Sequence, residues 1–261
     1  MNDYTISAIN QMPDEQKREI YGRLIPPEIV DKFSLNPNLL DSENRSLLFI
    51  RSAPGTTSAE MRLYHRFGFP DPILYGQIAD TIHGQIHILL YVLNDPFSPR
   101  FDVDCLPDGR PTHFGTQSRN LQAELAAMRF GLAPGQIRPG LHLLGPAINA
   151  FEHFVASLGH DLYFAEPLYF HNAIIFEHYG FAYQKGRKLM ERIHDGFTEN
   201  GNLREKLDGS SPFRNVNAIN SIRLRSWAIH DNLLGVPFSD VTMYKWIGKS
   251  AGINTSNNCP W

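Results

Sequence analysis

Residues 136–181 hold the pattern that most constrains the fold of this chain. They predict two helices with a short strand between them. The first helix opens on Gly145, and the second ends at Tyr179-Gly180 before a short returning strand. Because helix and strand alternate here, we expect the helices to pack on a sheet. The expected elements are a loop over 132–140, a helix over 144–158, a strand over 162–166, a helix over 168–178 and a strand over 181–183.

The part of the chain before this pattern predicts mostly strands. Short apolar runs separated by turns are typical of an antiparallel meander. Between the first two runs, residues 58–67 predict a helix with Ser58 as its cap. The expected strands are Leu47–Arg51, Ile73–Asp80, Gln85–Asn94 and Arg100–Asp104.

Helical patterns fill much of the remaining chain. We therefore predict an α+β fold in which a mixed, mostly antiparallel central sheet is flanked by helices. Residues 1–45 and 186–261 are expected to form N- and C-terminal helical extensions on a core of residues 46–185, within one domain overall. The further helices expected are 13–24, 28–33, 118–130, 188–197, 217–234 and 240–249.

Charge and composition argue against several classes of protein. The net charge of −3, without a long basic run, gives no electrostatic support for nucleic-acid binding. The best apolar run, Ile86–Leu93, has the length of a strand and not of a membrane span. Two cysteines do not make a disulfide framework, and the polar N-terminus differs from a signal peptide. We expect a cytoplasmic protein with neither a nucleic-acid nor a membrane partner.

Two short motifs mark the ends of the 136–181 pattern. His142-Leu-Leu-Gly145-Pro-Ala147 opens the first helix, and Phe176-Glu-His-Tyr-Gly-Phe181 ends the second. They resemble the Gln/Arg-x-x-Gly-x-Gly/Ala and Tyr-Glu-x-x-Gly-Phe signatures of the GCN5-related N-acetyltransferase superfamily. The resemblance implies an acyl-CoA N-acyltransferase-like fold. As function it implies transfer of an acyl group, most simply acetyl, from acyl-CoA to an unidentified small-molecule or peptide amine.

The resemblance also implies where acetyl-CoA, or another acyl-CoA, would bind as co-substrate. A helix N-terminus presents N–H groups and a partial positive charge, which suit a pyrophosphate. Arg138 adds charge because His142, which stands where the family has Gln or Arg, lacks a bidentate fork. We expect the coenzyme between the 100–104 strand and the helix that opens at Gly145. The expected binding residues are Arg138, His142, Leu143, Leu144, Gly145 and Ala147.

The expected catalytic groups differ from those of the family. Phe176 stands where the family has a tyrosine acid, and a phenyl ring has no proton to donate. Glu166, at the end of the 162–166 strand, is expected as base, and Tyr179 as acid. His171 and His178 lie seven residues apart on one helix, so they share a face and can relay a proton near neutral pH.

Two alternatives stay open. The chain can keep the fold without catalysis and act as a binding or dimerisation protein, with the 217–234 helix in a homodimer contact. A metal-dependent hydrolase is the other alternative, with His83, His87 and His113 as ligands. Because the sequence lacks an HExxH motif, a cysteine pair and a clear carboxylate partner, we expect no metal.

Overall fold

The computed structural model describes residues 4–112, 118–257 and 259–261. The chain divides into two compact units, neither of which is continuous in sequence. Unit 1 comprises Met1–Ser98, Gly140–Glu166 and Tyr244–Ser250. Unit 2 comprises Pro99–Pro139, Pro167–Met243 and Ala251–Trp261. The 136–181 pattern is therefore shared between the two units.

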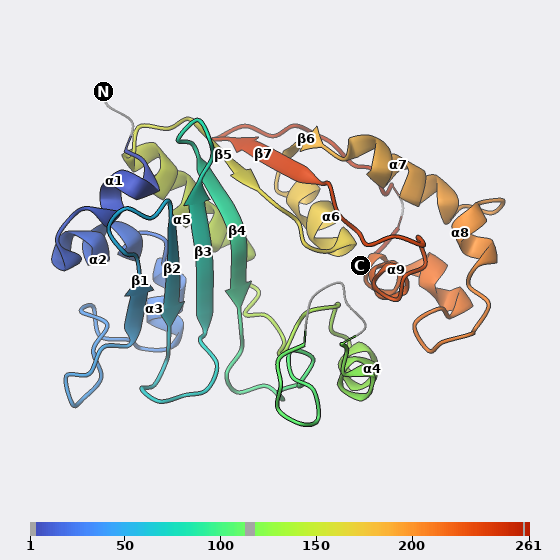
Figure 1. Cartoon of the computed structure of the whole chain (residues 1–261), viewed down its shortest axis with the longest axis horizontal. Helices are drawn as coiled ribbons and strands as arrows, with labels where there is room; N and C mark the ends of the chain where they lie inside the picture. The colour runs from blue at the N-terminus through green and yellow to red at the C-terminus, as the bar shows by residue number, and fades with distance from the viewer. Residues whose placement is uncertain (1–3, 113–117, 258) are drawn as a thin grey trace. The chain divides into compact units, whose positions relative to one another are not determined.

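Unit 1 contains an antiparallel meander followed by a parallel strand (Figure 1). The meander consists of β1 (Leu48–Arg51), β2 (Ser58–Leu63), β3 (Leu74–Asp80) and β4 (Ile86–Leu93). The next strand, β5 (Leu162–Ala165), runs parallel to β4. A parallel pair needs a crossover connection, and α5 (Leu144–Ser157) is the helix that directly precedes β5 in this connection.

The sheet is mixed and contains seven described strands in the order β1-β2-β3-β4-β5-β7-β6. β7 (Thr242–Trp246) begins in unit 2 and ends in unit 1, whereas β6 (Ala182–Lys185) belongs to unit 2. Of the pairings with a defined register, three are antiparallel and that of β4 with β5 is parallel. The predicted α+β class with a mixed sheet is confirmed.

The helices of unit 1 cover one face of its sheet. Figure 1 shows α1 (Ile6–Asn10), α2 (Asp14–Gly22), α3 (Pro27–Lys32) and α5 behind the strands. Aromatic rings pack within the helix layer and between this layer and the sheet. Tyr21 of α2 packs on Phe154 of α5 with ring centroids 6.4 Å apart, and Phe151 of α5 contacts Tyr91 and Tyr163 of the sheet. Burial of such rings is a main source of stability for a core of this kind.

The other face of β1–β3 carries no helix among the described residues of unit 1. Along β2, buried residues alternate with exposed or half-exposed ones, as expected for a strand with one covered face. Cross-strand pairing places Phe49 opposite Arg62, and Arg51 opposite Glu60. Aromatic and charged side chains therefore lie side by side on the uncovered face.

Unit 2 is mainly helical. Its core includes Trp227, which is fully buried, stacks on Phe213 and donates its indole N–H to the carbonyl oxygen of Leu132 at 2.8 Å. Besides β6, its described elements are α4 (Leu121–Phe130), α6 (Phe170–His178), α7 (Arg187–Gly196), α8 (Asn202–Glu205), the 3-10 helix η1 (Val216–Asn220) and α9 (Ile222–His230).

Two segments predicted as helices contain strands instead. Residues 58–67 contain β2, and residues 240–249 contain β7. Ala, Glu, Met, Arg and Leu in the first segment favour a helix, but intrinsic preferences amount to less than about 0.7 kcal/mol per residue. Pairing of β2 with β1 on one side and β3 on the other outweighs that preference.

Of two further predictions, one was wrong and the other was wrong in part. Arg100–Asp104 is not a strand, and Arg100 there forms ion pairs with Asp102 and Asp104 in irregular backbone. The helix predicted over 217–234 is divided into η1 and α9. Ser221 lies between them in an extended conformation, and its hydroxyl accepts a hydrogen bond from the N–H of Leu224 at 3.1 Å, which caps α9.

Candidate functional site

β4 and β5 pair over a short distance and then part. His87 lies opposite Phe164, and Ile88 lies opposite Ala165. The N–H of Glu166 donates a further bond to the carbonyl oxygen of Ile88 at 3.3 Å. β5 ends at this point. We call this end of the pairing, at Ile88, Ala165 and Glu166, the fork.

β4 continues past the fork. Residues Leu89–Leu93 have no register partner on β5 in the described part of the chain, and they are only half buried although all except Tyr91 are aliphatic. On the β3 side the register shifts between Gln77 and Ile78, so that Leu89 is the extra residue of a β-bulge. A bulged residue is left out of the ladder, so the Leu89 N–H is a candidate donor at the fork.

The loop before α5 runs beside the far end of β4. A side-chain carbon added at Gly140 would lie 3.6 Å from the carbonyl oxygen of Leu93. His142 then adopts a left-handed conformation with φ of 57°, which costs a residue with a side chain about 1–2 kcal/mol. Leu143 is the N-cap of α5. The loop therefore leads from the end of β4 directly to the start of α5.

The first turn of α5 is suited to an anion. Leu143 offers no side-chain cap, and the turn contains no acidic residue. The N–H of Ala147 bonds to the Leu143 carbonyl oxygen at 2.9 Å, and Pro146 has no N–H. The N–H groups of Leu144 and Gly145 have no partner within the helix and stand at the positive end of its dipole.

Glu166 and His87 lie on the same face of the sheet at the fork. Side chains two residues apart on an extended chain point to the same face. Glu166 therefore lies on the face of Phe164, which is the register partner of His87. Nε2 of His87 is buried without a hydrogen-bond partner. Burial lowers the pKa of His87, an effect that the Glu166 carboxylate partly offsets. His87 is therefore a neutral imidazole beside an exposed carboxylate.

His87 was considered from the sequence only as a metal ligand. Its place beside Glu166 depends on the parallel pairing of two strands that are far apart in the chain. The sequence shows a histidine between Ile86 and Ile88, which are buried in the structure. This pattern indicates a strand position but does not indicate which strand pairs with it.

The predicted site residues are divided between the units. In unit 2, Arg138 is buried, His178 is exposed at the end of α6, and Tyr179 is the C-cap of α6. Unit 1 contains Glu166, His142, Leu143, Leu144, Gly145 and Ala147, and unit 2 contains Arg138, His171, His178 and Tyr179.

His171 is buried where α6 meets α9. Its ring stacks on Tyr169, and its Nδ1 atom lies 2.8 Å from Oγ of Ser226. Burial, together with repulsion from His230, lowers the pKa of His171 to about 3. The side chain is therefore neutral at physiological pH and contributes to the packing of the two helices.

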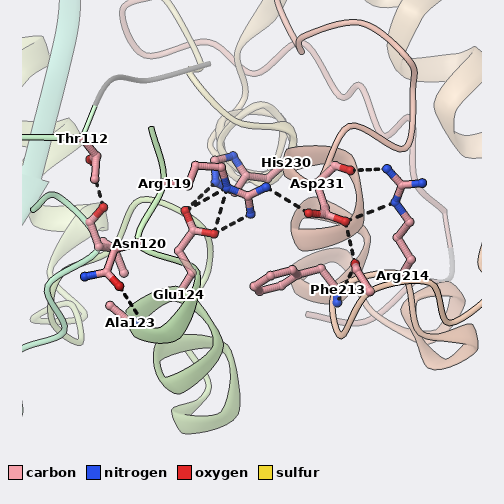
Figure 2. Close-up of polar contacts among 11 residues, drawn as sticks. Thr112, Arg119, Asn120, Ala123, Glu124, Phe213, Arg214, His230 and Asp231 are labelled. Atoms are coloured by element: carbon pink, nitrogen blue, oxygen red, sulfur yellow. Dashed lines mark hydrogen bonds and ion pairs between the residues drawn. The ribbon is translucent and has the colours of Figure 1, made fainter. Parts of the chain in front are cut away.

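Unit 2 also contains a polar network that the sequence did not predict (Figure 2). Arg119 donates to both carboxylate oxygens of Glu124 and, at 2.9 Å, to Asp231. Nε2 of His230 lies 3.1 Å from Oε1 of Glu124, and Arg214 donates to Asp231 at 3.2 Å. We call these five side chains the ionic network. Because each member is paired with another, we assign it a structural role.

Hydrogen bonding and the Arg119 charge shape the chemistry of this network. Burial by itself raises the pKa of Glu124, but hydrogen bonds from His230 and Arg119 outweigh it and hold the pKa below its usual value. Glu124 is therefore ionised at neutral pH although it is only 4% exposed. No sequence motif signals the network, since the contacts Arg119–Asp231 and Glu124–His230 each join residues more than a hundred positions apart.

The described part of the chain contains neither a cluster of metal ligands nor a membrane-spanning helix. The described residues contain no group of three or more His, Cys, Asp or Glu side chains placed to hold a metal ion, and His113 lies outside the described residues. None of the helices in the described ranges is long and apolar enough to cross a membrane. No protein-family model, curated protein or solved structure matches this chain.

Proposed function

We propose that the protein is an acyl-CoA-dependent N-acyltransferase whose acyl donor lies along β4, from the fork to the start of α5. One observation carries the proposal. The edge of β4 that β5 leaves unpaired joins a carboxylate and an imidazole at one end to an uncapped helix N-terminus at the other. All of these parts belong to unit 1.

The shape of this region suits coenzyme A. A pantetheine arm contains two amide groups, which can hydrogen-bond to a free strand edge as an added strand would. From Leu89 to Leu93 the edge extends ~13 Å, at ~3.3 Å per residue. The pyrophosphate then meets the N–H groups of Leu144 and Gly145, and the thioester lies at the fork.

The groups at the fork suit acyl transfer to an amine. The amine nitrogen attacks the thioester carbon, and the N–H of Leu89 can donate to the oxygen on which negative charge collects. Glu166 takes the proton that the amine loses. The C–S bond then breaks, and the proton passes to the thiolate. The products are an amide and coenzyme A with a free thiol, so the reaction needs no other reactant.

One observation favours binding without transfer as a second candidate. In unit 2, Phe176 stacks on Phe181 with ring centroids 4.9 Å apart, at the position where the family resemblance implies a tyrosine acid. A phenyl ring cannot protonate a leaving thiolate. If no other acid replaces it, the chain would hold an acyl-CoA without turning it over.

Binding is tested with a variant that blocks the pyrophosphate. Gly145→Glu places a negative charge in the first turn of α5, where the helix dipole favours it but a pyrophosphate would be repelled. We expect acetyl-CoA at 100 times its dissociation constant to stabilise the wild type by about 2.7 kcal/mol in thermal unfolding and to leave Gly145→Glu unchanged. Asn149→Glu, an exposed position one turn further along α5, is the matched control and should behave as wild type.

Transfer is tested separately by release of free thiol from acetyl-CoA in the presence of a panel of amines. Glu166→Gln is expected to bind the donor normally and to lose transfer, because an amide cannot accept the proton. Binding by the wild type without thiol release would favour the second candidate. If neither acetyl-CoA nor longer acyl-CoA stabilises the wild type, both candidates fail.

A further inference from the structure

The uncovered face of unit 1 contains a pocket that the proposed reaction does not use. It has a volume of about 580 Å³, within the range of small-molecule sites. It lies at the β1–β2 end of the sheet and includes the turn that follows β2. Aromatic rings from both parts form its walls: Phe49, Tyr64, Phe67 and Phe69.

The aromatic rings of this pocket are exposed but held in place. Phe49 is 46% exposed and Phe67 is 40% exposed. Phe49 meets Tyr64 edge to face, with centroids 5.7 Å apart, and lies 6.5 Å from Phe67. Arg45 stacks over Phe67 at 4.4 Å. Fixed rings that remain open to solvent form a surface on which a flat apolar group can stack at little entropic cost.

The charges of the pocket favour an anion. Arg51, Glu60 and Arg62 line it, which leaves a net charge of +1. Glu60 is engaged by Arg62, and its side chain is only 18% exposed. No carboxylate in the described ranges lies within ion-pair distance of Arg51, and this side chain is exposed. A planar guanidinium of this kind pairs with a carboxylate through two parallel hydrogen bonds.

The edge of β1 is already occupied on its outer side. Arg18 of α2 donates to the carbonyl oxygen of Leu48 at 3.0 Å, and Lys17 donates to that of Ser52 at 3.3 Å. Long basic side chains over an edge strand discourage pairing with a further strand. The pocket is therefore better suited to a small molecule than to a peptide added to the sheet.

We propose that this pocket, formed by Phe49, Phe67 and Arg51 and backed by the Glu60–Arg62 pair, binds a small molecule that carries one aromatic ring and one carboxylate. The ring stacks on the solvent-facing surface that Phe49 and Phe67 form together, and the carboxylate pairs with Arg51. The site goes beyond the proposed transferase function and does not depend on it.

Matched ligands test the two halves of this recognition. The probes are phenylacetate, 3-phenylpropionate and indole-3-acetate, titrated in ligand-observed NMR against the full-length protein. We expect at least one to bind with a dissociation constant of about 1 mM or tighter. The neutral amide of that acid, and an aliphatic carboxylate of similar length, should each bind at least tenfold more weakly, since each lacks one half of the chemistry.

Variants assign the binding to this pocket. Arg51→Gln should weaken the aromatic acid at least tenfold and leave its amide unchanged, whereas Phe49→Ala should weaken both. Both positions are exposed, so both variants are expected to fold, which circular dichroism checks. Arg23→Gln and Phe97→Ala remove an arginine and a ring at exposed positions that do not line the pocket, and they should bind as wild type.

Three results would overturn the proposal. The first is that none of the three acids binds at about 1 mM. The second is that acid and amide bind equally. The third is that binding survives both Arg51→Gln and Phe49→Ala. Gly145→Glu should leave binding of the aromatic acid unchanged, so failure of this proposal and failure of the transferase proposal give different results.

Discussion

The two units use charged side chains in opposite ways. In unit 1 the pair Glu60–Arg62 lies on an uncovered sheet face, where the Arg62 side chain is 48% exposed. In unit 2 the pair Glu124–Arg119 is largely buried, with side-chain exposures of 6% and 18%. Unit 1 also leaves backbone groups of β4 and of the first turn of α5 without partners in their own elements, whereas the ionic network of unit 2 is paired within itself.

This difference distinguishes polar groups that can bind a ligand from polar groups that stabilise the fold. An unsatisfied group at the surface can exchange water for a ligand at modest cost. A buried charged group must be paired at all times, because its desolvation is expensive. We therefore place candidate binding chemistry in unit 1 and regard the network of unit 2 as the means by which α4 and α9 are held in register.

The largest expected effect comes from breaking the buried network. Glu124→Gln leaves Arg119 and His230 without their shared carboxylate, and should lower the free energy of unfolding by about 3–5 kcal/mol. Urea denaturation followed by tryptophan fluorescence measures this. The matched change Glu60→Gln on the uncovered face should cost less than about 1 kcal/mol, because water solvates Arg62. Equal losses in the two variants would contradict the comparison.

Aromatic residues provide a second pair of variants with a somewhat smaller expected difference. Phe213 is 4% exposed and stacks on Trp227 at 5.3 Å, so Phe213→Ala should cost about 3 kcal/mol or more. Phe49, at 46% exposed, should cost less than about 0.5 kcal/mol when changed to Ala. Thermal unfolding of both variants measures the difference. A strongly destabilised Phe49→Ala would show that the uncovered face carries part of the core.

The smallest expected effect is the pH dependence that His171 confers. Its pKa is lowered to about 3 in the folded protein, so the unfolded chain binds a proton more readily. This contribution is complete above the ordinary histidine pKa of about 6.5 and is lost as the pH falls from there toward about 3. Urea denaturation at pH 6.5 and pH 5 should show a fall in stability that His171→Gln reduces.

A second histidine separates this effect from general acid sensitivity. His87→Gln in unit 1 should also reduce the slope, since burial lowers the pKa of His87 as well, although Glu166 offsets part of that shift. Asn149→Gln changes an exposed side chain that does not titrate and should leave the slope as in wild type. An unchanged slope in His171→Gln would mean that His171 takes up a proton in the folded protein near neutral pH.

Local patterns were enough to predict much of the secondary structure. The predicted bounds lie within a few residues of the observed ones for the strands β3, β4 and β5 and for the helices α5, α6 and α7. In each of them, the apolar spacing and the residues that end the element agree. The same is not true of residues 58–67, whose composition favours a helix while their alternation fits the strand that the neighbouring strands impose.

The candidate site was predicted less well than the elements that carry it. The helix start at Gly145 and the carboxylate Glu166 were both identified from sequence, and both lie in unit 1. The partner of Glu166 at the fork, His87, was not, because 79 positions separate the two residues and only the parallel pairing of β4 with β5 brings them to one face. The placement of His171, His178 and Tyr179 in unit 2 could likewise not be predicted from the sequence.

The sequence by itself determined the α+β class, most element boundaries and the helix start at Gly145, since these depend on neighbours within a few positions. Only the tertiary structure decided that β4 extends beyond the end of β5. It also decided that the sheet face with Arg51 and Phe49 is uncovered, and that Glu124 is ionised while buried. Each of these depends on long-range pairing or on the exclusion of water, and neither leaves a trace in local composition.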